Sequence, residues 1–591
     1  MISKWNYLPL TEKEKQAKEI LSRTLGLDPY ICELLVLRRV TNGAGPKKFF
    51  RPQLSDLYDP FLLNDMDKAV NRLNKAMGSK EKILIYGDSF PNSVFAQNNG
   101  MIQLTGDYDV DGTTAVALVY KFLQNFYSGL DCYIPDRYDE GYGISIKGID
   151  YAEKNGFSLI IALDCGIKAI EKVEYAKSKG IDFIICDHHV PDKELPGAVA
   201  VLDPKRDDST YPYQHLSGCG VGFKFMQAFA ISNNLSIKEY LFPLLDLMAV
   251  SIASDIVPIT DENRILAFHG LKQLNSNPSN GLKAIIDLCG LKNKDITTSD
   301  IVFKIGPRIN ASGRVQSGKE AVDLLISKDP EGAKEKGENI NQYNETRKEI
   351  DKQVTGEANK ILENLKDFES HKSIVIYNPD WHKGIIAIVA SRLTELYYRP
   401  AIVLTFSNGL VTGSARSVQG FDVYKAIESC RDLLENFGGH TYAAGLSLKE
   451  ENIPTFIERF ENYVAENILP EQMMPQIDID ATIDFKDITP SFLKTLKQFN
   501  PFGPGNTKPI FCTKRVLDYG TSRLVGRELE HLKLEMVDSR SENIMNGIAF
   551  GMHEHNEYIK AHHPFDICYT IEENTHNKNI QLMIKDIQPS K

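Results

Sequence analysis

Short apolar segments alternate with helical segments over residues 101–260, and this alternation constrains the fold more than any other feature of the chain. The strand candidates are apolar throughout, as in MIQLT (101–105), SLIIALD (158–164) and DFIICD (182–187). Strands without a polar face are typical of a parallel sheet that helices cover on both sides. The sequence therefore predicts an α/β fold built on a parallel sheet.

Other patterns divide the remainder of the 591 residues, a length that corresponds to roughly three or four domains. Apolar residues at helical spacing predict a mostly helical region at 1–80, ahead of the parallel-sheet domain at 81–330. A polar stretch at 331–370 predicts a long connecting helix, followed by a smaller α/β domain at 371–470. Short strands separated by turn signals such as PFGPGN and DYG predict a C-terminal β-barrel at 475–591.

The net charge of −11 opposes binding to nucleic acid unless a basic surface exists locally. Residues 486–533 supply one, because nine Lys or Arg stand against four Asp or Glu there, a local charge of +5. Five aromatic residues accompany this segment, and they predict either stacking of single-stranded bases or, more ordinarily for each one, a place in the barrel core. They are Phe485, Phe492, Phe499, Phe502 and Phe511.

The cysteine pattern and the absence of long apolar runs bear on location. Nine cysteines are scattered without a CxxC pair, which indicates reduced thiols in a cytoplasmic protein and argues against a disulfide framework or a zinc ribbon. No apolar run approaches the ~18 residues of a membrane span. The N-terminal MISKWNYLPLTEKEKQ also carries no apolar core of a secretory signal.

Acidic and imidazole side chains follow several of the apolar segments. MIQLTG runs into DYDVDG (107–112), LIIAL into Asp164, and DFIIC into Asp187-His188-His189, while LLDLMAVSIAS, taken as a fourth strand end, precedes Asp255. Ligands bind at the carboxyl edge of a parallel sheet, and buried carboxylates need a cation to offset their repulsion. A DxD alone is more often a turn, and a lone DHH a surface or core pair. Together they predict a site for Mn²⁺, with Mg²⁺ also plausible.

At this point the sequence resembles a known family. DYDVDG, DCG (164–166), DHH (187–189) and SIASDIVP (251–258) are similar to the four motifs of the DHH phosphoesterase superfamily. Later segments resemble the RecJ family of single-stranded-DNA-specific 5′→3′ exonucleases: GPRINASGR (306–314), HKGIIAIVASRL (382–393), GSARS (413–417), FGGHTYAAGL (437–446) and PFGPGN (501–506). The resemblance implies a DHH domain, a DHHA1 domain marked by GGH, and an OB-fold barrel.

The resemblance also implies the residues of a centre with two Mn²⁺ or Mg²⁺ ions. The implied metal ligands are Asp107, Asp109, Asp111, Asp164, His188 and Asp255, with Asp164 as the bridge between the ions. Asp187 would orient His188 from behind, and His189 would contact the phosphate that is cut. The activity implied is hydrolysis of the phosphodiester by water, releasing 5′-mononucleotides.

Two further groups are implied to bind the phosphates of the substrate. Arg308, Asn310 and Arg314 would clamp non-bridging oxygens, although a solvated loop is the ordinary alternative for this segment. A 5′-phosphate pocket would be formed by Arg137, Ser414, Arg416, Gly438, Gly439 and His440, with a turn at the two glycines. Ser414 and Arg416 face alike if that segment is extended. His382 is a weaker candidate, since a histidine at a helix start is as often structural.

The implied role is degradation of single-stranded DNA from its 5′ end in repair and recombination. The implied partners are a RecQ-type helicase and a single-strand-binding protein, and the implied state is a monomer. Two alternatives stay open: a phosphodiesterase for short oligonucleotides or cyclic dinucleotides, and a RecJ-like scaffold with an impaired site. The first is disfavoured by the length of the chain.

The second alternative rests on a duplicated strand signal. KILIYGD (82–88) looks like the strand that should lead directly into YDVDG, yet residues 88–106 intervene and end in the similar MIQLTG. Either the first copy is the central strand and 89–106 loop out, or the second copy occupies that place and the first is displaced, or the insertion disrupts the site. We expect the second arrangement, because metal ligands must stay attached to a strand in the sheet.

Overall fold

The computed structural model describes residues 3–41, 44–87, 110–135, 140, 143–315, 318–365, 367–538, 540, 543–574 and 577–590. The chain forms two compact units. One joins Met1–Gln53 to Met474–Lys591, and the other comprises Leu54–Gln97 and Ile102–Met473. The predicted N-terminal region at 1–80 is thus shared between the two units.

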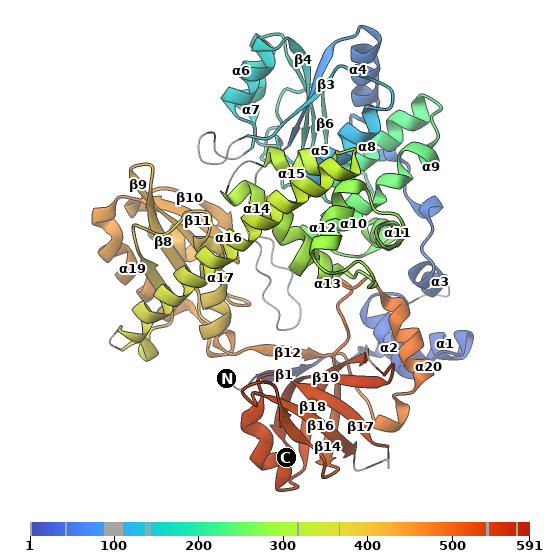
Figure 1. Ribbon diagram of the computed structural model, residues 1–591, viewed down its shortest axis with the longest axis vertical. Coiled ribbons are helices and arrows are strands. Elements are labelled where there is room, and N and C mark those ends of the chain that lie inside the picture. Colours follow the sequence, from blue (N-terminus) through green and yellow to red (C-terminus); the bar gives the residue numbers. More distant parts are fainter. Residues whose placement is uncertain are drawn as a thin grey trace. The chain divides into compact units, whose positions relative to one another are not determined.

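A five-stranded parallel sheet organises the first half of the larger unit (Figure 1). Its spatial order is β3 (Leu130–Tyr133), β2 (Lys82–Gly87), β4 (Phe157–Leu163), β5 (Asp182–Cys186) and β6 (Ala200–Leu202). Every neighbouring pair is parallel. The parallel-sheet α/β fold predicted from the apolar segments is confirmed.

Helices cover both faces of this sheet, which explains why its strands are apolar throughout. Ile83 and Ile85 of β2 face a core shared with α4 (Met66–Gly78), α5 (Val110–Leu123) and α8 (Gly218–Ser232). Leu84 and Tyr86 point to the opposite core, beneath α6 (Ile146–Lys154) and α7 (Ile170–Ser178). Alternate strand residues therefore enter different cores, and each is withdrawn from water.

A group of helices follows the sheet, and two sequence expectations are corrected there. LLDLMAVSIAS, taken as a strand, is the helix α10 (Leu245–Ser254), so Asp255 follows a helix. Apart from Asp246 and the terminal Ser254, every residue of α10 is a buried apolar or small group, and a run that is apolar all round cannot be assigned to strand or helix by periodicity. GPRINASGR is also helical, as α14 (Gly306–Val315), and is not a solvated loop.

A single long helix, α16 (Pro330–Glu363), leads from this group to the second α/β part (Figure 1). Its start is specified locally: Pro330 occupies the first position, and the Asp329 carboxylate accepts the amide protons of Glu331 and Gly332. Ile340, Val354 and Ala358 are buried along it. The helix packs against both halves of the unit.

The second α/β part is built on a mixed sheet with the order β10 (Leu434–His440), β11 (Ala443–Leu448), β9 (Leu410–Arg416), β8 (Ala401–Ser407) and β7 (Ile374–Tyr377). α17 (Ile386–Tyr397) covers one face, while α18 (Val423–Glu428) and α19 (Ile453–Asn467) cover the other. Gly438, Gly439 and His440 lie in strand β10 and pair with β11. The turn expected at the two glycines is therefore wrong, since the chain reverses after His440.

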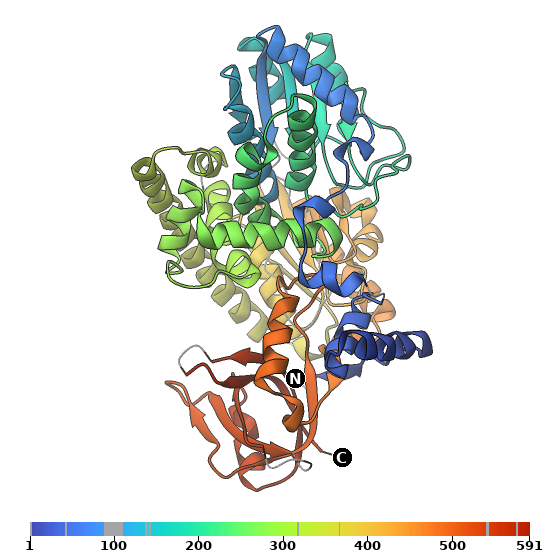
Figure 2. The same cartoon turned by 90° about the vertical axis from the view of Figure 1, so that its right-hand side faces the viewer.

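The smaller unit contains a closed five-stranded barrel (Figure 2). Its strands are β14 (Phe511–Asp518), β16 (His531–Asp538), β17 (Met545–Ala549), β19 (Ile580–Pro589) and β18 (Phe565–Glu573), in that order around the barrel. β18 pairs again with β14 and closes the ring. A short helix, α21 (Asn556–Lys560), connects β17 to β18. This is the predicted β-barrel, with OB-fold connectivity.

The N-terminal segment completes the barrel unit, with α1 (Glu12–Leu25) and α2 (Pro29–Leu37) beside it in Figure 2. Strand β1 (Lys4–Tyr7) pairs in parallel with β12 (Gln476–Ile479). The Arg38 guanidinium donates to Asn506 Oδ1 at 2.8 Å and to the carbonyl of Thr507 in the PFGPGN region. None of the described helices is both long and apolar enough to span a membrane.

Candidate metal centre

Four acidic or imidazole side chains converge at the carboxyl edge of the parallel sheet. Asp111 lies in the first turn of α5, Asp164 follows β4, His188 follows β5, and Asp255 follows α10. All four are buried. Nε2 of His188 lies 3.1 Å from Asp164 Oδ1, 3.7 Å from Asp255 Oδ2 and 3.9 Å from Asp111 Oδ2. Residues from four separate segments of the chain thus face one point.

The protonation state of His188 indicates which kind of group can bind among these four side chains. Its Nδ1 lies 3.0 Å from the carbonyl oxygen of Leu216, so Nδ1 carries the proton and donates it. Burial holds the pKa of His188 well below its ordinary value, and the charges of His189 and Lys205 act in the same direction. The imidazole is therefore neutral, and the lone pair of Nε2 faces three carboxylates. A divalent cation is the group that satisfies such a donor set.

Two overlapping sets of three residues have the spacing of metal ligands among the described residues. One is Asp164, His188 and His189, and the other is Asp111, His188 and Asp255. The ligand atoms within each set lie within 4.8 Å of one another. Asp107 and Asp109, also predicted as ligands, lie outside the described residues. The residues that are described fit a centre for hard divalent ions, since they offer carboxylate and imidazole and no thiolate.

Asp111 is held by the first turn of α8 and by α10. Its two oxygens accept the amide protons of Gly218 at 2.6 Å and Cys219 at 2.9 Å, and the hydroxyl of Ser251 donates to it at 2.7 Å. Burial raises the pKa of Asp111 despite these three donors. At Gly218, a Cβ atom would lie 2.6 Å from the Cβ of Asp164, so only glycine allows this approach.

Asp164 owes its position to an unusual backbone conformation. It adopts a φ of 61°, in the left-handed region, immediately after β4. Aspartate and asparagine enter this region more readily than other residues with a side chain, at a cost of order 1 kcal/mol. The amide of Asp164 still donates to the carbonyl of Cys186, at 2.8 Å. The chain therefore leaves the sheet sharply while its carboxylate stays at the sheet edge.

Asp187 organises the neighbouring histidine rather than His188. Its Oδ1 lies 2.7 Å from Nδ1 of His189 and accepts the amide protons of both histidines, while Oδ2 accepts the amide of Ile167 at 2.9 Å. Burial by itself would raise the pKa of Asp187, but the charge of His189 and these hydrogen bonds lower it below its ordinary value. The expectation that Asp187 orients the His188 ring is wrong, because the carbonyl of Leu216 does so.

The structure decides between the two copies of the strand signal. β2 is the first copy, and it lies between β3 and β4 in the sheet. Its last residue packs closely on α5, since a Cβ at Gly87 would lie 2.5 Å from Val116 Cγ2. The expectation that the first copy is displaced is therefore wrong. Residues 88–109, which include the second copy, lie outside the described residues, and Asp111 reaches the cluster directly after them.

The three residues of the predicted phosphate clamp lie on α14 but do not share one face. Positions 308 and 314 differ by about 240° around a helix, whereas 310 and 314 differ by about 40°. Arg308 accordingly donates to Asn341 of α16 at 2.9 Å, while Arg314 donates to the carbonyl of Gly384, before α17, at 2.7 Å. Asn310 and Arg314 thus lie on the side of the second α/β part, and Arg308 does not.

Ser414 and Arg416 are neighbours on β9, as the alternation predicted. Nη1 of Arg416 donates to Ser414 Oγ at 2.9 Å. His440 ends β10, and its pKa is lowered by burial and by the charges of His189, Lys168 and Lys205. The second α/β part therefore presents His440 toward the edge that carries His189. Arg137 lies outside the described residues, and His382 accepts the amide proton of Gly384, a local structural contact.

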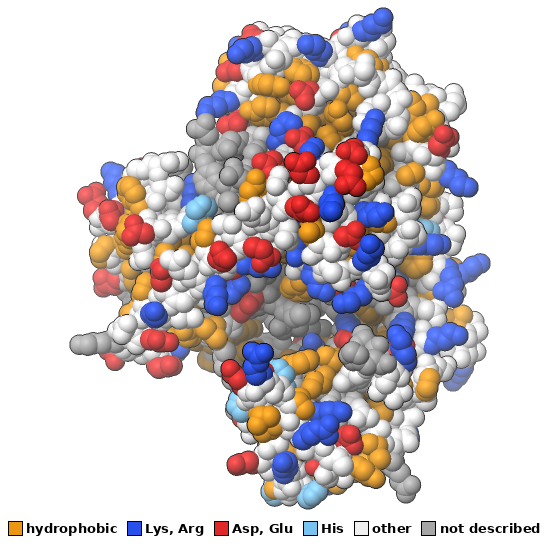
Figure 3. Space-filling view, in the orientation of Figure 1, with side chains coloured by type: hydrophobic (Ala, Val, Ile, Leu, Met, Phe, Trp, Pro, Cys, Tyr) orange, Lys and Arg blue, Asp and Glu red, His pale blue; other side chains and the backbone are white. Residues whose placement is uncertain are grey.

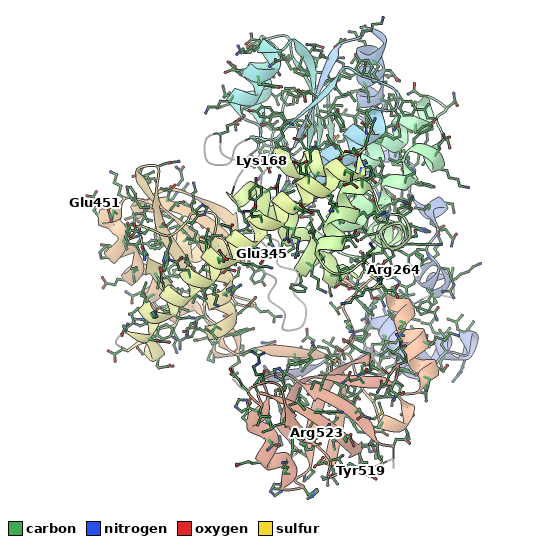
Figure 4. The ribbon with its side chains drawn as sticks, in the orientation of Figure 1. Lys168, Arg264, Glu345, Glu451, Tyr519 and Arg523 are labelled. Carbon is green, nitrogen blue, oxygen red and sulfur yellow. The ribbon has the colours of Figure 1, made fainter. Side chains whose placement is uncertain are left out.

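Several groups at this edge were missed from the sequence. Ser251 and the amides of Gly218 and Cys219 hold Asp111, and they come from segments with no acidic signal. Asp203 could have been predicted from the sequence, since AVAVLD (198–203) is another apolar segment that ends in aspartate. It follows β6 and is fully buried. Figure 4 labels Lys168 near the end of the parallel sheet, after β4, and its ammonium lies 3.5 Å from Asp192.

Three family models match successive parts of the chain: DHH family, N-terminal domain, at residues 101–252; DHHA1 domain at 371–466; and RecJ OB domain at 479–586. The structure is similar to the crystal structure of RecJ in complex with Mn²⁺ from Thermus thermophilus. The TM-score is 0.82 at 22% identity, over 100% of this chain and 80% of that chain. This likeness confirms the fold class predicted from the sequence.

Curated relatives cover almost the whole chain. The single-stranded-DNA-specific exonuclease RecJ of Bacillus subtilis is 35% identical over 96% of this chain and 69% of its own length. The protein of the same name from Haemophilus influenzae is 32% identical over 91% of this chain and 92% of its own length. The chain therefore belongs to the RecJ family of single-stranded-DNA-specific exonucleases.

Proposed function

We propose that this chain is a metal-dependent exodeoxyribonuclease that hydrolyses single-stranded DNA from a 5′ end and releases 5′-mononucleotides. The observation that carries the proposal is the neutral His188, whose Nε2 lone pair faces three buried carboxylates. A bound divalent cation relieves the repulsion among these carboxylates, and such a cation at a sheet edge beside a second α/β part suits phosphodiester hydrolysis. Among the described residues, no contact favours a phosphodiesterase for dinucleotides.

Asp111, Asp164, His188 and Asp255 would hold Mn²⁺ or Mg²⁺, with Asp107 and Asp109 as further ligands by resemblance to the family. Two such ions, when bound, supply Lewis acidity that activates water and offsets charge on the phosphate. The chain's own contribution is positioning. Asp111 is fixed by three donors, and His188 is fixed by the Leu216 carbonyl, so the ligands are oriented before any ion arrives.

His189 would contact the phosphate that is cut. Asp187 holds Nδ1 of His189 at 2.7 Å, which leaves Nε2 as the atom available to the substrate. Because the pKa of Asp187 is lowered, this carboxylate stays ionised and favours a protonated His189. A protonated Nε2 donates a charge-assisted hydrogen bond to a phosphate oxygen. His189 is therefore proposed as a substrate-contacting residue and Asp187 as the residue that positions it.

A pocket for the 5′ phosphate explains the proposed polarity. Ser414, Arg416, Gly438, Gly439 and His440 belong to the second α/β part, with Arg137 added by resemblance. Asn310 and Arg314 would bind phosphate oxygens between this pocket and the metal centre. α16 packs against both parts, and a strand terminus that fills the pocket would present its first phosphodiester to the centre.

The barrel would hold the strand farther from its 5′ end, and the structure changes which residues do so. Phe485, Phe492, Phe499 and Phe511 are buried in the barrel core, and the partly buried Phe502 packs on it. The outer face of β16 and its neighbours instead presents exposed groups. Arg523 pairs with Lys533 across two strands, Tyr519 is 55% exposed, and Phe550 is 57% exposed. Figure 4 labels Tyr519 and Arg523 on the barrel, and Figure 3 shows basic and apolar side chains interspersed there.

Basic groups with exposed aromatic rings bind single strands without base preference, which supports this assignment for the barrel. By resemblance to the family, we also propose a cytoplasmic, monomeric enzyme of DNA repair and recombination. Its proposed partners are a RecQ-type helicase, which would supply the single strand, and a single-strand-binding protein.

The decisive test compares substrates and metals. The purified chain is incubated with 5′-phosphorylated single-stranded DNA, duplex DNA and a cyclic dinucleotide, each with Mn²⁺ and with chelator. We expect mononucleotide release from the single strand only, and only with the metal. Asp164→Asn, which preserves side-chain shape and tolerates the left-handed backbone, should abolish it. Cleavage that persists in Asp164→Asn, or that prefers the cyclic dinucleotide, would overturn the proposal.

A further inference from the structure

Lys205 is a half-buried cation at the carboxyl edge of the sheet, and it has no role in the site as described so far. It follows β6 by three positions, beside the strand that ends in Asp187-His188-His189. Its side chain makes no salt bridge or hydrogen bond to any described residue, whereas its neighbour Arg206 makes several. A half-buried ammonium without an anionic partner is unfavourable in the isolated protein and marks a position suited to an anionic ligand.

The backbone that carries Lys205 is rigid. Its amide donates to Asp203 Oδ1 at 2.6 Å. The adjacent Arg206 guanidinium donates to Asp65 at 2.8 Å, to the carbonyl of Val201 at 2.7 Å and to Asp208 at 2.7 Å. Asp65 belongs to a distant segment before α4, and the other partners lie within residues 201–208. The Lys205 side chain therefore projects from a fixed point, and little conformational freedom of the backbone is lost when it binds a ligand.

The charge of the Lys205 ammonium affects titratable groups of both the metal centre and the second α/β part. The amide of Asp187 donates to the carbonyl of Leu202 at 3.0 Å, so the segments after β5 and β6 run side by side. The positive charge of Lys205 contributes to lowering the pKa of His188 in the metal centre, after burial and His189, and that of His440 on β10, after burial, His189 and Lys168. Lys205 thus lies within electrostatic range of both His188 and His440.

Asp203, which accepts the amide proton of Lys205, does not cancel the charge of its side chain. Burial, together with the negative charge of Asp187, raises the pKa of Asp203 to about 8. Asp203 is therefore mostly protonated near neutral pH, and its Oδ2 is buried without a hydrogen bond to any described residue. The side chain of Lys205 thus keeps a positive charge that no salt bridge to a described residue offsets.

We infer that Lys205 contacts a non-bridging oxygen of the phosphate that is cut and so is a substrate-binding residue for the reaction. The inference rests on the proposed function and adds a residue to it. The first phosphodiester fits better than the 5′-terminal phosphate, because the segment of Lys205 lies beside that of His188 and His189, while the pocket at Ser414 and Arg416 belongs to the second part. Lysine suits this place as a compact charge on a flexible stem, without needing the planar fork of arginine.

Three variants separate charge from structure. Lys205→Gln removes the ammonium, Lys205→Arg keeps a positive charge, and Lys154→Gln is the matched control. Lys154 is an exposed lysine at the C-terminus of α6, at the opposite, amino edge of the sheet. For a 5′-phosphorylated single strand with Mn²⁺, we expect kcat/KM to fall about 10- to 100-fold in Lys205→Gln, from the loss of one charge-assisted hydrogen bond. Lys205→Arg should recover part of the loss, and Lys154→Gln should match the wild type.

The position of the contact is tested by binding strands with a neutral methylphosphonate at the first, second or third linkage. Binding is followed by fluorescence anisotropy in Ca²⁺ with the full chain. We expect Lys205→Gln to weaken binding of the unmodified strand and of the second- and third-linkage strands by the same factor. It should leave binding of the first-linkage strand unchanged, because that oxygen charge is already absent.

An equal loss on all four strands would overturn the inference, and so would a loss cancelled only at the second or third linkage. A variant that is merely less stable would lose affinity equally on every strand, so misfolding cannot imitate the expected pattern. Failure of the proposed function is distinguishable from failure of this inference. If the proposed function is wrong, the wild type releases no mononucleotide with Mn²⁺. The binding experiment, which tests the inference, does not depend on cleavage.

Discussion

Replacing Asp255 by asparagine should stabilise the metal-free protein and remove its stabilisation by Mn²⁺. Asp255 is buried, follows the last residue of α10, and shares a prospective metal site with Asp111 and His188. Asparagine has nearly the same shape and leaves the amide contact from Asp255 to the carbonyl of Ser251 in place. The substitution therefore changes the charge of the centre more than its packing.

The magnitude follows from the geometry of the centre. The ligand oxygens of Asp111 and Asp255 lie within 4.8 Å, and two unit charges at that separation repel by roughly 3 kcal/mol at an effective dielectric constant of about 20. Asp255 also places a negative charge at a helix C-terminus, which costs about 0.5 kcal/mol. Because burial raises the pKa of Asp111, protonation already relieves part of the repulsion. We therefore expect the variant to gain about 1–3 kcal/mol without metal.

Binding of Mn²⁺ should change which of the two proteins is the more stable. At a free Mn²⁺ concentration about 100 times the dissociation constant, binding stabilises the wild type by about 2.7 kcal/mol. If the loss of one charged ligand weakens binding about 100-fold, the same concentration stabilises Asp255→Asn by only about 0.4 kcal/mol. The difference in free energy of unfolding that favours the variant should therefore shrink to near zero or change sign.

Amide hydrogen exchange of β4 and β5 measures the free energy of local opening and suits a chain with several domains. It is recorded for wild type and variant in chelator and in Mn²⁺. An apo variant that is less stable than the wild type would contradict the account of repelling carboxylates. An equal Mn²⁺-induced change in both proteins would remove Asp255 from the metal site.

Three further predictions concern pH, backbone space and the barrel. Since the pKa of Asp203 is raised to about 8, the folded chain holds a proton between about pH 4 and pH 8 that the unfolded chain lacks. The stability of the wild type therefore falls as pH rises from about 4 to 8, so the gain of Asp203→Asn over the wild type, measured by urea unfolding in chelator, should be larger at pH 8 than at pH 5. Gly439→Ala should destabilise β10 and β11 by about 1–3 kcal/mol, because φ is 150° there and the new Cβ would lie 2.5 Å from Ala444 Cα. In Gly438→Ala the new Cβ meets no atom within 4 Å, so this control should leave thermal unfolding unchanged. Equal effects of the two substitutions on thermal unfolding would contradict this reasoning. Lys533→Gln on the outer barrel face should reduce the slope of log K for single-strand binding against log salt concentration by about 0.7, because one phosphate contact is lost. Lys560→Gln in α21 is the control and should leave this slope unchanged. Identical slopes for both variants, in titrations at several salt concentrations, would place the DNA elsewhere.

Much of the metal centre was predictable from local patterns. Asp164 and His188 each end an apolar strand, and parallel strands bring their carboxyl ends to one edge. The same rule applied to AVAVLD would have included Asp203. Asp164 and His188 lie close together as expected, because strand, edge and neighbour are all determined by short segments of sequence.

Other parts of the site depend on contacts that no local pattern contains. Asp255 reaches the centre from a helix, and a run that is apolar on all sides looks the same in a helix as in a buried strand. The tautomer of His188 is set by the carbonyl of Leu216, 28 positions away, and Asp111 is held by amides 107 and 108 positions away. Likewise, both copies of the strand signal are apolar, and only pairing with β3 and β4 selects KILIYG.

Periodicity and residue type act over a few positions, and they were enough to establish the class of each domain, the order of the motifs and the chemistry of the metal ligands. Packing between distant segments settled the rest: which side of α14 each arginine faces, which phenylalanines fill the barrel core, and that Lys205 is half-buried without a salt bridge to any described residue. Those outcomes depend on burial and on electrostatic neighbours from remote parts of the chain, and both quantities exist only once the chain has folded.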